Sequence, residues 1–238
     1  MTINSYSDSW FRIFMATIPS EQTRAEVAFV ATLLPPRARV LDLACGVGRH
    51  AIPLGDCGFT VVGLDRDRAA LGQARARDRG LLWVEADLRK LPFRSEAFDS
   101  VICMWQSFGY FDSSENENLL RQLRTITTPS GLLLLDIYNR EFFENSPRIS
   151  RFTRGGRDIC QRTSLSGGRL NVKLDYDDTG TGDEFDWQVF SPDELGALAR
   201  RCGWEVQLTC SGYDTHQAAS GRQARVQYLL KHHGEEMS

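Results

Sequence analysis

The chain has 238 residues, of which 42% are hydrophobic and 25% are charged, and its formal net charge is −3. These values are ordinary for a globular protein, and the length fits one α/β domain with an insertion. The small net charge gives no reason to expect a nucleic acid or another polyanion as partner. No apolar run approaches the roughly 20 residues that a membrane helix needs.

The first residues of the chain and its cysteines indicate in which cellular compartment the protein is expected. The first residues show no basic stretch followed by an apolar one, so no signal peptide is predicted. The six cysteines form no Cys-x-x-Cys pair, and several stand in apolar runs. This pattern favours buried free thiols in a reducing compartment over a disulfide framework or a zinc site. We therefore expect a cytoplasmic protein without a bound metal.

The first two-thirds of the chain alternate between helical and strand patterns. Residues 10–34 read as a helix that Pro35 and Pro36 end, within an N-terminal helical lid over residues 1–36. A cofactor-binding core is predicted over residues 37–143. Its expected strands are 40–43, 60–64, 81–85, 100–104 and 132–137, and its expected helices are 50–57, 68–79 and 115–126. This alternation with continuous apolar strands predicts a parallel sheet covered on both faces.

The remainder of the chain no longer alternates between strand and helix patterns. Two strand-like segments, 157–164 and 170–175, flank Ser166-Gly167-Gly168, which is a hairpin signal, and 179–182 is a second turn signal. We predict a small antiparallel insertion over residues 150–190. Residues 191–238 then supply a helix that ends at Gly203, with Ser191 as N-cap, and two last strands at 204–210 and 224–231. The predicted fold is α/β: a single domain, 1–238, with a doubly wound, Rossmann-like, seven-stranded and mostly parallel sheet, helices on both faces, and the antiparallel insertion.

The strongest local signal is the stretch 40–50, which reads as a buried strand, then glycines, then the start of a helix. Gly46 and Gly48 would let the backbone approach a ligand closely. Asp65 stands nineteen residues after Gly46, at the end of the next strand, where an acid can accept hydrogen bonds from ribose hydroxyls. Asp87 follows the third strand. Ligands of open α/β sheets bind outside the carboxyl ends of the strands, so these residues predict a site there.

Two cofactors compete for this site. Residues 46–51 also fit the Gly-x-Gly-x-x-Gly/Ala dinucleotide fingerprint, with Asp65 in the ribose position. However, Asp42 would lie close to the pyrophosphate of a dinucleotide and repel it, whereas the sulfonium and ammonium of S-adenosylmethionine (SAM) tolerate an acid. Asp87 offers an acceptor for an adenine amine, which the dinucleotide fingerprint does not require. The residues therefore favour SAM, with S-adenosylhomocysteine (SAH) as its product, over a nicotinamide cofactor.

The same stretches resemble a known family. Residues 40–50 look like motif I of the class I SAM-dependent methyltransferases, 61–65 look like motif II, and 85–93 resemble the next motif. Residues 98–111 are similar to the fourth motif of a bacterial small-molecule branch with a Ser-Phe-Gly-Tyr-Phe signature. The resemblance is strong over 10–143 and weak towards the end of the chain.

Two further features of that branch are present. An Asp-x-x-Asn-Arg stretch follows the fifth strand, seen here as Asp136-Ile-Tyr-Asn139-Arg140. An aromatic N-terminal helix precedes a Glu-x-x-Arg stretch, matched by Trp10, Phe14 and residues 21–24. The loops at 211–214 and 220–225 match only loosely, so the resemblance does not specify the acceptor.

The resemblance implies a set of cofactor contacts. Asp65 would bind the ribose hydroxyls, Asp87 the adenine amine, and the Leu88 amide an adenine nitrogen. The glycine loop and the Ala44 carbonyl would line the methionine part, and Trp10 would help to close the site. The implied cofactor residues are Trp10, Asp42, Ala44, Gly46, Gly48, Asp65, Arg66, Asp87, Leu88 and Met104, the last through its backbone beside the sulfonium.

A second set of residues is expected on the acceptor side. Tyr110, after the fourth strand, and His216, in a polar loop, are candidates for a general base, although Tyr110 could equally be an aromatic pocket wall. Trp105 and Phe108 stand beside Tyr110 in an aromatic cluster that would suit a cationic or apolar acceptor. Asn139 could orient a polar acceptor or cap the following turn.

The predicted function is transfer of a methyl group from SAM to a nitrogen or oxygen of a small molecule, for example a natural-product intermediate, by in-line displacement. A SAM-binding protein with non-methylating chemistry and a nicotinamide-dependent oxidoreductase remain as alternatives. A nucleic-acid methyltransferase is disfavoured, because no Asn/Asp-Pro-Pro-aromatic motif follows the fourth strand. The insertion is expected to cover the acceptor pocket rather than to form a dimer contact, and both a monomer and a homodimer remain open.

Overall fold

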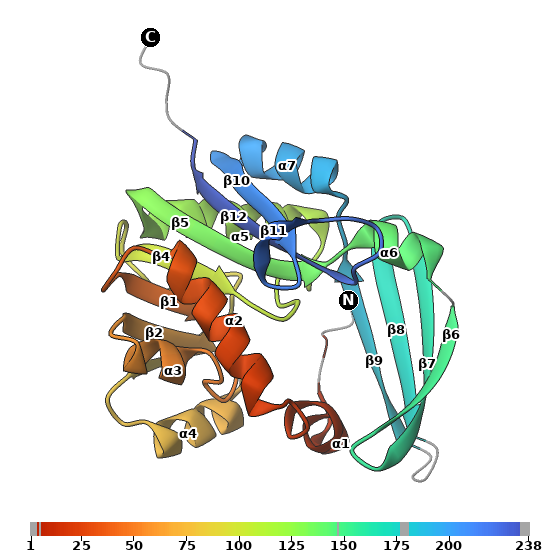
Figure 1. The fold of residues 1–238 in the computed structure, drawn as a ribbon. Helices are drawn as coiled ribbons and strands as arrows, with labels where there is room; N and C mark the ends of the chain where they lie inside the picture. Colours follow the sequence, from red (N-terminus) through yellow and green to blue (C-terminus); the bar gives the residue numbers. More distant parts are fainter. Residues whose placement is uncertain (1–3, 5, 147, 177–180, 234–238) are drawn as a thin grey trace.

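The structure is a computed structural model that describes residues 4, 6–146, 148–176 and 181–233. Its larger sheet has eight strands in the order β11-β10-β12-β5-β4-β1-β2-β3 (Figure 1). The strands are β1 (Arg39–Leu43), β2 (Thr60–Asp65), β3 (Leu82–Glu85), β4 (Phe98–Cys103), β5 (Thr127–Tyr138), β10 (Trp204–Ser211), β11 (Asp214–Ala218) and β12 (Arg225–His232). β1 to β5 are parallel, whereas β12 runs antiparallel to β5 and β10 antiparallel to β12.

The number of strands corrects the sequence prediction of seven. All seven predicted strands are present within a few residues of their expected ends, and β11 is the additional one. β11 pairs with β10 at the sheet edge, and each of its five residues is exposed. A short strand with no buried face leaves no alternation of apolar and polar residues, so its sequence carries no strand signal.

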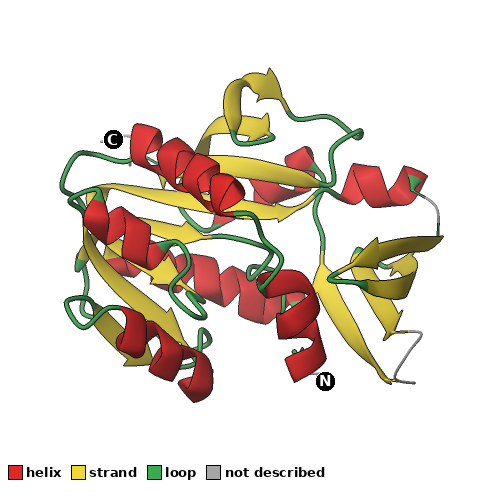
Figure 2. Ribbon diagram, turned by 60° about the horizontal axis from the view of Figure 1, so that its bottom comes forward, coloured by secondary structure: helices red, strands yellow, loops and turns green. Residues whose placement is uncertain are grey.

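Helices cover both faces of this sheet, as predicted (Figures 1 and 2). α2 (Ser20–Leu33), α3 (Ala51–Asp56) and α4 (Arg68–Arg77) lie on one face. α5 (Ser113–Ile126) and α7 (Pro192–Arg201) lie on the other. α7 begins with the expected capping box between Ser191 and Glu194. The two faces therefore carry separate apolar cores, and the carboxyl ends of the parallel strands stay free for a ligand.

The N-terminal segment differs from the single helix predicted over residues 10–34. It forms a short helix, α1 (Asp8–Trp10), one turn of π-helix, η1 (Phe11–Met15), and a break before α2. Pro19 lies in this break with an extended backbone, at φ −61° and ψ 142°. Proline donates no backbone hydrogen bond, and its ring disfavours a helical residue before it, so the helix ends and restarts.

A second sheet has four antiparallel strands in the order β6-β7-β8-β9, and Figure 1 shows it beside the carboxyl ends of the main strands. It consists of β6 (Ile149–Arg154), β7 (Arg157–Ser166), β8 (Arg169–Tyr176) and β9 (Thr181–Gln188), and the short α6 (Arg140–Asn145) leads into it. Gly167 and Gly168 make the predicted β7–β8 turn, with φ of 56° and 74° as a two-residue hairpin requires. Of the second predicted turn, residues 179 and 180 lie outside the described residues.

The cysteines and helices allow two further comparisons with the sequence. All six cysteines are free, and five are buried as expected. Cys57, which follows the last residue of α3, is exposed. Among the described residues, no helix is both long and apolar enough to cross a membrane.

Candidate active site

A cavity of about 850 Å³ lies between the carboxyl ends of the main strands and the inner face of the small sheet. This volume is near the upper end of the roughly 300–1,000 Å³ typical of small-molecule sites. One part, called here the strand-end half, is lined by Asp42, Ala44, Gly46, Arg49, Asp65, Arg66, Asp87 and Leu88. The other part, the aromatic half, is lined by Tyr6, Trp10, Phe14, Trp105, Tyr110, Tyr138, Phe152, Arg154, Gln161, Val172, Leu174, Phe185, Trp187 and Arg225.

Asp65 organises the turn after β1. Its carboxylate accepts hydrogen bonds from the backbone amides of Gly46 (2.7 Å) and Asp67 (2.8 Å). Burial raises the pKa of Asp65, while these two bonds oppose the shift. The acid that sequence analysis placed at the ribose position therefore also fixes the glycine loop beside it.

Gly48 shapes the turn without lining the cavity. Its φ is 76°, and a Cβ at this position would stand 2.6 Å from the Trp83 ring. No other residue fits such a position without moving the indole. Gly48 thus packs behind the loop, and its contact with a cofactor remains a prediction.

Asp42 is a buried carboxylate at 2% exposure, and its Oδ2 atom has no hydrogen-bond partner among the described residues. Burial raises its pKa to about 7, and the nearby charge of Arg49 opposes the rise. The Arg49 Nη2 atom is likewise buried without a partner. An unsatisfied acceptor and an unsatisfied donor, both costly when buried, therefore line the strand-end half together.

Glu26 in α2 supports this part of the cavity from behind. It is fully buried and accepts bonds from Arg49 (2.6 Å), His50 (2.8 Å) and the Trp105 indole (3.0 Å). Burial alone would raise the pKa of Glu26, but His50 and Arg49 outweigh burial and lower it to about 2. His50 is tied to this carboxylate, and burial lowers its own pKa. Glu26 and Arg49 were not singled out from the sequence, because their contact joins α2 to the turn before α3.

Asp87 and Leu88 line the cavity as expected, as does Arg66. The Asp87 carboxylate is already paired with Arg89, at 2.6 Å from Nη2, and the Arg89 side chain lowers the pKa of Asp87. Arg66 donates to the carbonyl of Asn4 at the start of the chain. This edge of the strand-end half is therefore closed by arginines that sequence reasoning did not pair.

The turn after β4 is strained. Trp105 and Gln106 both adopt left-handed backbone conformations, with φ of 58° and 64°. Such conformations cost non-glycine residues roughly 1–2 kcal/mol each. Asp136 holds the turn: its carboxylate accepts from the Trp105 amide (3.0 Å) and its carbonyl from the Gln106 amide (2.9 Å). The turn places Met104 and Trp105 against the cavity.

Asp136 also anchors Arg225. The carboxylate is fully buried and accepts from Arg225 Nη2 (2.6 Å), Gln227 (2.8 Å) and the Tyr213 hydroxyl (3.0 Å). The Arg225 guanidinium lies over the rings of Trp105 and Tyr138, at 5.4 and 5.3 Å from their centroids. Arg225 stands 89 positions after Asp136, so nothing in the local sequence indicated this pair.

Tyr110 lies in the aromatic half, where its hydroxyl shares a short hydrogen bond with that of Tyr6. Burial raises the pKa of Tyr110 to about 12. The hydroxyl therefore stays protonated near neutral pH, which disfavours the general-base role considered for it and favours a pocket wall. Trp10 lies beside Tyr6 and stacks on Phe14.

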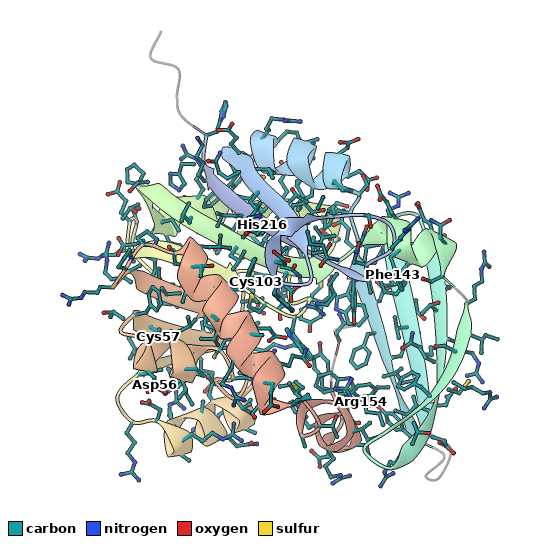
Figure 3. The ribbon with its side chains drawn as sticks, in the orientation of Figure 1. Asp56, Cys57, Cys103, Phe143, Arg154 and His216 are labelled. Carbon is teal, nitrogen blue, oxygen red and sulfur yellow. The ribbon has the colours of Figure 1, made fainter. Side chains whose placement is uncertain are left out.

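Three predicted acceptor-side residues lie away from the cavity. Phe108 is fully buried in the main core and stacks on Phe190. Asn139 caps α6 by accepting from the amide of Glu141, and its side-chain amide donates to the carbonyl of Ser220. The His216 side chain is exposed on β11 (Figure 3). The structure therefore gives Phe108 a packing role and Asn139 a capping role, and it places His216 on an exposed strand outside the cavity lining.

Most of the aromatic half was missed from the sequence. Tyr6, Phe152, Arg154, Phe185 and Trp187 line it from the first residues and from the small sheet. Alternating burial along β8 and in β9 is visible in the sequence as apolar residues at every second position. That pattern predicts a buried sheet face, but it does not indicate which ligand or segment covers the face.

Comparison with known proteins agrees with this geometry. Residues 40–131 match the sequence model of a methyltransferase domain family. The protein YqeM of Bacillus subtilis is 24% identical over 206 residues, covering 80% of this chain and 83% of YqeM. The demethylmenaquinone methyltransferase of Renibacterium salmoninarum is 32% identical over 108 residues, and the chain spans only 44% of that relative's length.

Solved structures share the fold over nearly the whole chain. The CcbJ methyltransferase from Streptomyces caelestis superposes with a TM-score of 0.80 at 17% identity, covering 92% of each chain. The sugar N-methyltransferase KedS8 from Streptoalloteichus sp. superposes with a TM-score of 0.68 at 19% identity, covering 97% of this chain and 95% of KedS8.

The Rossmann-like sheet with acids at its strand ends is the architecture of the class I methyltransferases. Residues 40–131 match a methyltransferase domain and YqeM is named as a putative methyltransferase, so the protein is a methyltransferase, with the fold of solved SAM-dependent methyltransferases.

Proposed function

We propose that the protein transfers the methyl group of SAM to the nitrogen of a small-molecule amine. The observation that carries this proposal is one continuous cavity, which has acids at one end and a mainly aromatic wall at the other. One half would hold the cofactor and the other the acceptor, so that both reactants meet in line.

The strand-end half suits SAM by its unsatisfied groups. The amino-acid end of SAM carries an ammonium and a carboxylate, and Asp42 and Arg49 offer a buried acceptor and a buried donor without partners. Asp65 would accept from the ribose hydroxyls and Asp87 from the adenine amine, while Ala44, Gly46, Leu88 and the Met104 backbone line the space between. SAM supplies an activated methyl group, and these residues bind and orient it.

The aromatic half favours an amine over a hydroxyl acceptor. The residues assigned to this half above include no His, Asp or Glu, and Tyr110 has a pKa of about 12. His50 also lines the cavity, but its ring is bonded to the Glu26 carboxylate. A hydroxyl acceptor gains roughly 10²–10⁴-fold from a general base, whereas a neutral amine needs none. The cationic side chain of Arg154 favours the neutral form of an amine bound near it.

The names of similar proteins support the same choice. KedS8 is a sugar N-methyltransferase, and MtfA is a glycopeptide N-methyltransferase. Both act on nitrogen, and their likeness to this chain lies in the fold.

The test is a calorimetric titration of SAM, SAH and NADH into the purified protein, followed by SAH release assays with matched amines and alcohols such as benzylamine and benzyl alcohol. We expect micromolar binding of SAM and SAH, and turnover confined to amines. Binding of NADH alone would replace the proposal with an oxidoreductase. SAM binding without turnover of any amine across a broad panel would favour non-methylating chemistry.

A further inference from the structure

We infer that the acceptor is an anion as well as an amine: an apolar or aromatic molecule whose carboxylate or phosphate binds Arg154. This inference deepens the proposed function and rests on it for the place of the acceptor. Arg154 is the last residue of β6 and lines the cavity. Figure 3 shows it between the N-terminal turn η1 and the small sheet.

Arg154 is anchored but has no counter-ion. Its Nε donates to the Thr17 hydroxyl at 2.8 Å and its Nη2 to the Phe14 carbonyl at 3.2 Å. Both partners are neutral, and the described residues give Arg154 no carboxylate partner. Burial lowers the pKa of Arg154, as it does for a cation withdrawn from water without compensation. The guanidinium is therefore held in a fixed orientation with donors to spare.

Arg154 differs from the other arginine of the aromatic half, Arg225, because no carboxylate among the described residues neutralises its charge. The described charged residues of that half are Arg154 and Arg225. Arg225 is neutralised by Asp136 at 2.6 Å, so one positive charge remains uncompensated. A guanidinium in a partly desolvated pocket is suited to a planar anion, which it can bind through two parallel hydrogen bonds.

The aromatic rings lead to the same conclusion. Sequence analysis suggested that the cluster would suit a cationic or an apolar acceptor, and a cation would bind to its ring faces. In the structure, Arg49 and Arg225 lie over the Trp105 ring, and Arg154 lies over Phe14 at 5.1 Å from the centroid. The chain's own cations already occupy these faces, so a second cation would be repelled. The rings then contribute apolar surface to the acceptor, and Arg154 contributes the charge.

The test measures binding of matched anions and neutral analogues to protein saturated with SAH. The probes are phenylacetate, phenylacetamide and phenyl phosphate, and the readout is calorimetric affinity. We expect phenylacetate or phenyl phosphate to bind about 10- to 100-fold more tightly than phenylacetamide, as a hydrogen bond to a charged group implies. Tighter binding of phenyl phosphate than of phenylacetate assigns the anion as a phosphate, and the reverse order assigns it as a carboxylate.

Two variants locate the preference. In Arg154→Gln the anions should lose their advantage over phenylacetamide, while Arg154→Lys should keep part of it. Arg162→Gln is the matched control, because Arg162 lies on the exposed side of β7, away from the cavity, and pairs with Asp175. Thermal unfolding of each variant shows whether the fold persists. If Arg154→Gln unfolds, the anion preference is measured in Arg154→Lys instead.

Equal affinity for phenylacetate and phenylacetamide, no binding of any probe, or an advantage that survives in Arg154→Gln would overturn the inference. Failure of the proposed function would look different, because SAM and SAH themselves would not bind or no amine would be methylated. The probes are therefore titrated both with and without SAH.

Discussion

The two halves of the cavity are built from different kinds of contact. In the strand-end half, the Asp65 carboxylate accepts a hydrogen bond from the backbone amide of Gly46, nineteen positions earlier in the sequence. In the aromatic half, Tyr6 meets Tyr110 across 104 positions and Asn4 bonds to the backbone of Asp186 across 182. The first half is local and follows from the strand-turn-helix unit. The second exists only once the N-terminal segment and the small sheet pack together.

This difference has a functional consequence. A cofactor site made from turns next to strand ends stays the same while distant segments change, because it depends on backbone geometry. The aromatic half depends on side chains from insertions, so substitutions there would alter the acceptor without disturbing the cofactor. The experiments below separate the two halves, beginning with the residue that joins them.

The largest effect is expected at Asp136, which holds the turn between the halves. Asp136→Asn leaves the buried Arg225 guanidinium without a counter-ion, which should destabilise the fold by about 3–5 kcal/mol. Urea unfolding would measure the loss. Asp99→Asn is the control, since Asp99 pairs with Arg39 at 2.8 Å but with both side chains more than a third exposed. It should cost less than about 1 kcal/mol. Equal costs at the two sites would contradict the importance given to burial.

The next effect concerns the strand-end half alone. Asp65→Ala removes the acceptor of the Gly46 amide and the proposed ribose contact, so SAM should bind about 100-fold more weakly, or about 3 kcal/mol. Asp78→Ala is matched to it, because Asp78 also accepts from two backbone amides, of Gly80 and Leu81, in a turn away from the cavity. SAM affinity, measured by calorimetry, should be unaltered there. An unchanged affinity in Asp65→Ala would remove the role given to Asp65.

A smaller effect is expected within the aromatic half. Tyr110→Phe or Tyr6→Phe leaves one buried hydroxyl without its partner, at a cost of roughly 1–2 kcal/mol in unfolding free energy. The double variant should cost less than the sum of the two single ones, because neither hydroxyl is then left unpaired. Additive losses in the double-mutant cycle would mean that the two hydroxyls do not interact. SAM affinity should stay within about two-fold in all three proteins, since the hydroxyls lie outside the strand-end half.

The smallest effect is a pH dependence that originates at Asp42. Its pKa is raised to about 7 in the fold, from a usual value of 3.8. The unfolded chain therefore ionises first, so stability due to Asp42 is present below about pH 4 and is lost as pH rises to about 7. SAM carries positive charge and favours the ionised form, so its affinity should rise by at most about 10-fold between pH 6 and 8. Calorimetry on Asp42→Asn supplies the reference, because that variant keeps every titration in the complex except that of Asp42. The same pH slope in both proteins would contradict this assignment.

The strand-end half could largely be predicted from the sequence, whereas most of the aromatic half could not. Asp42, Asp65 and Asp87 could be placed at one sheet edge because parallel strands bring their carboxyl ends together. The helix break at Pro19 could have been predicted from the proline itself. The helical pattern on either side of Pro19 instead led to the prediction of one continuous helix. The Asp136–Arg225 pair and the lack of a carboxylate beside Arg154 in the described part of the chain could not be predicted, because each depends on which distant segment of the chain becomes a neighbour. His216 illustrates the converse error: a chemically suitable residue lies on an edge strand outside the cavity.

The tryptophans that line the cavity also equip the protein for optical measurement. Of its five tryptophans, Trp10, Trp105 and Trp187 lie on the cavity wall, whereas Trp204 is fully enclosed in the main core. Indole emission depends on polarity and on nearby quenchers, so filling the aromatic half should change the fluorescence of the unlabelled protein. An acceptor could then be sought by its spectral signature in a plate reader, before any product of its methylation has been identified.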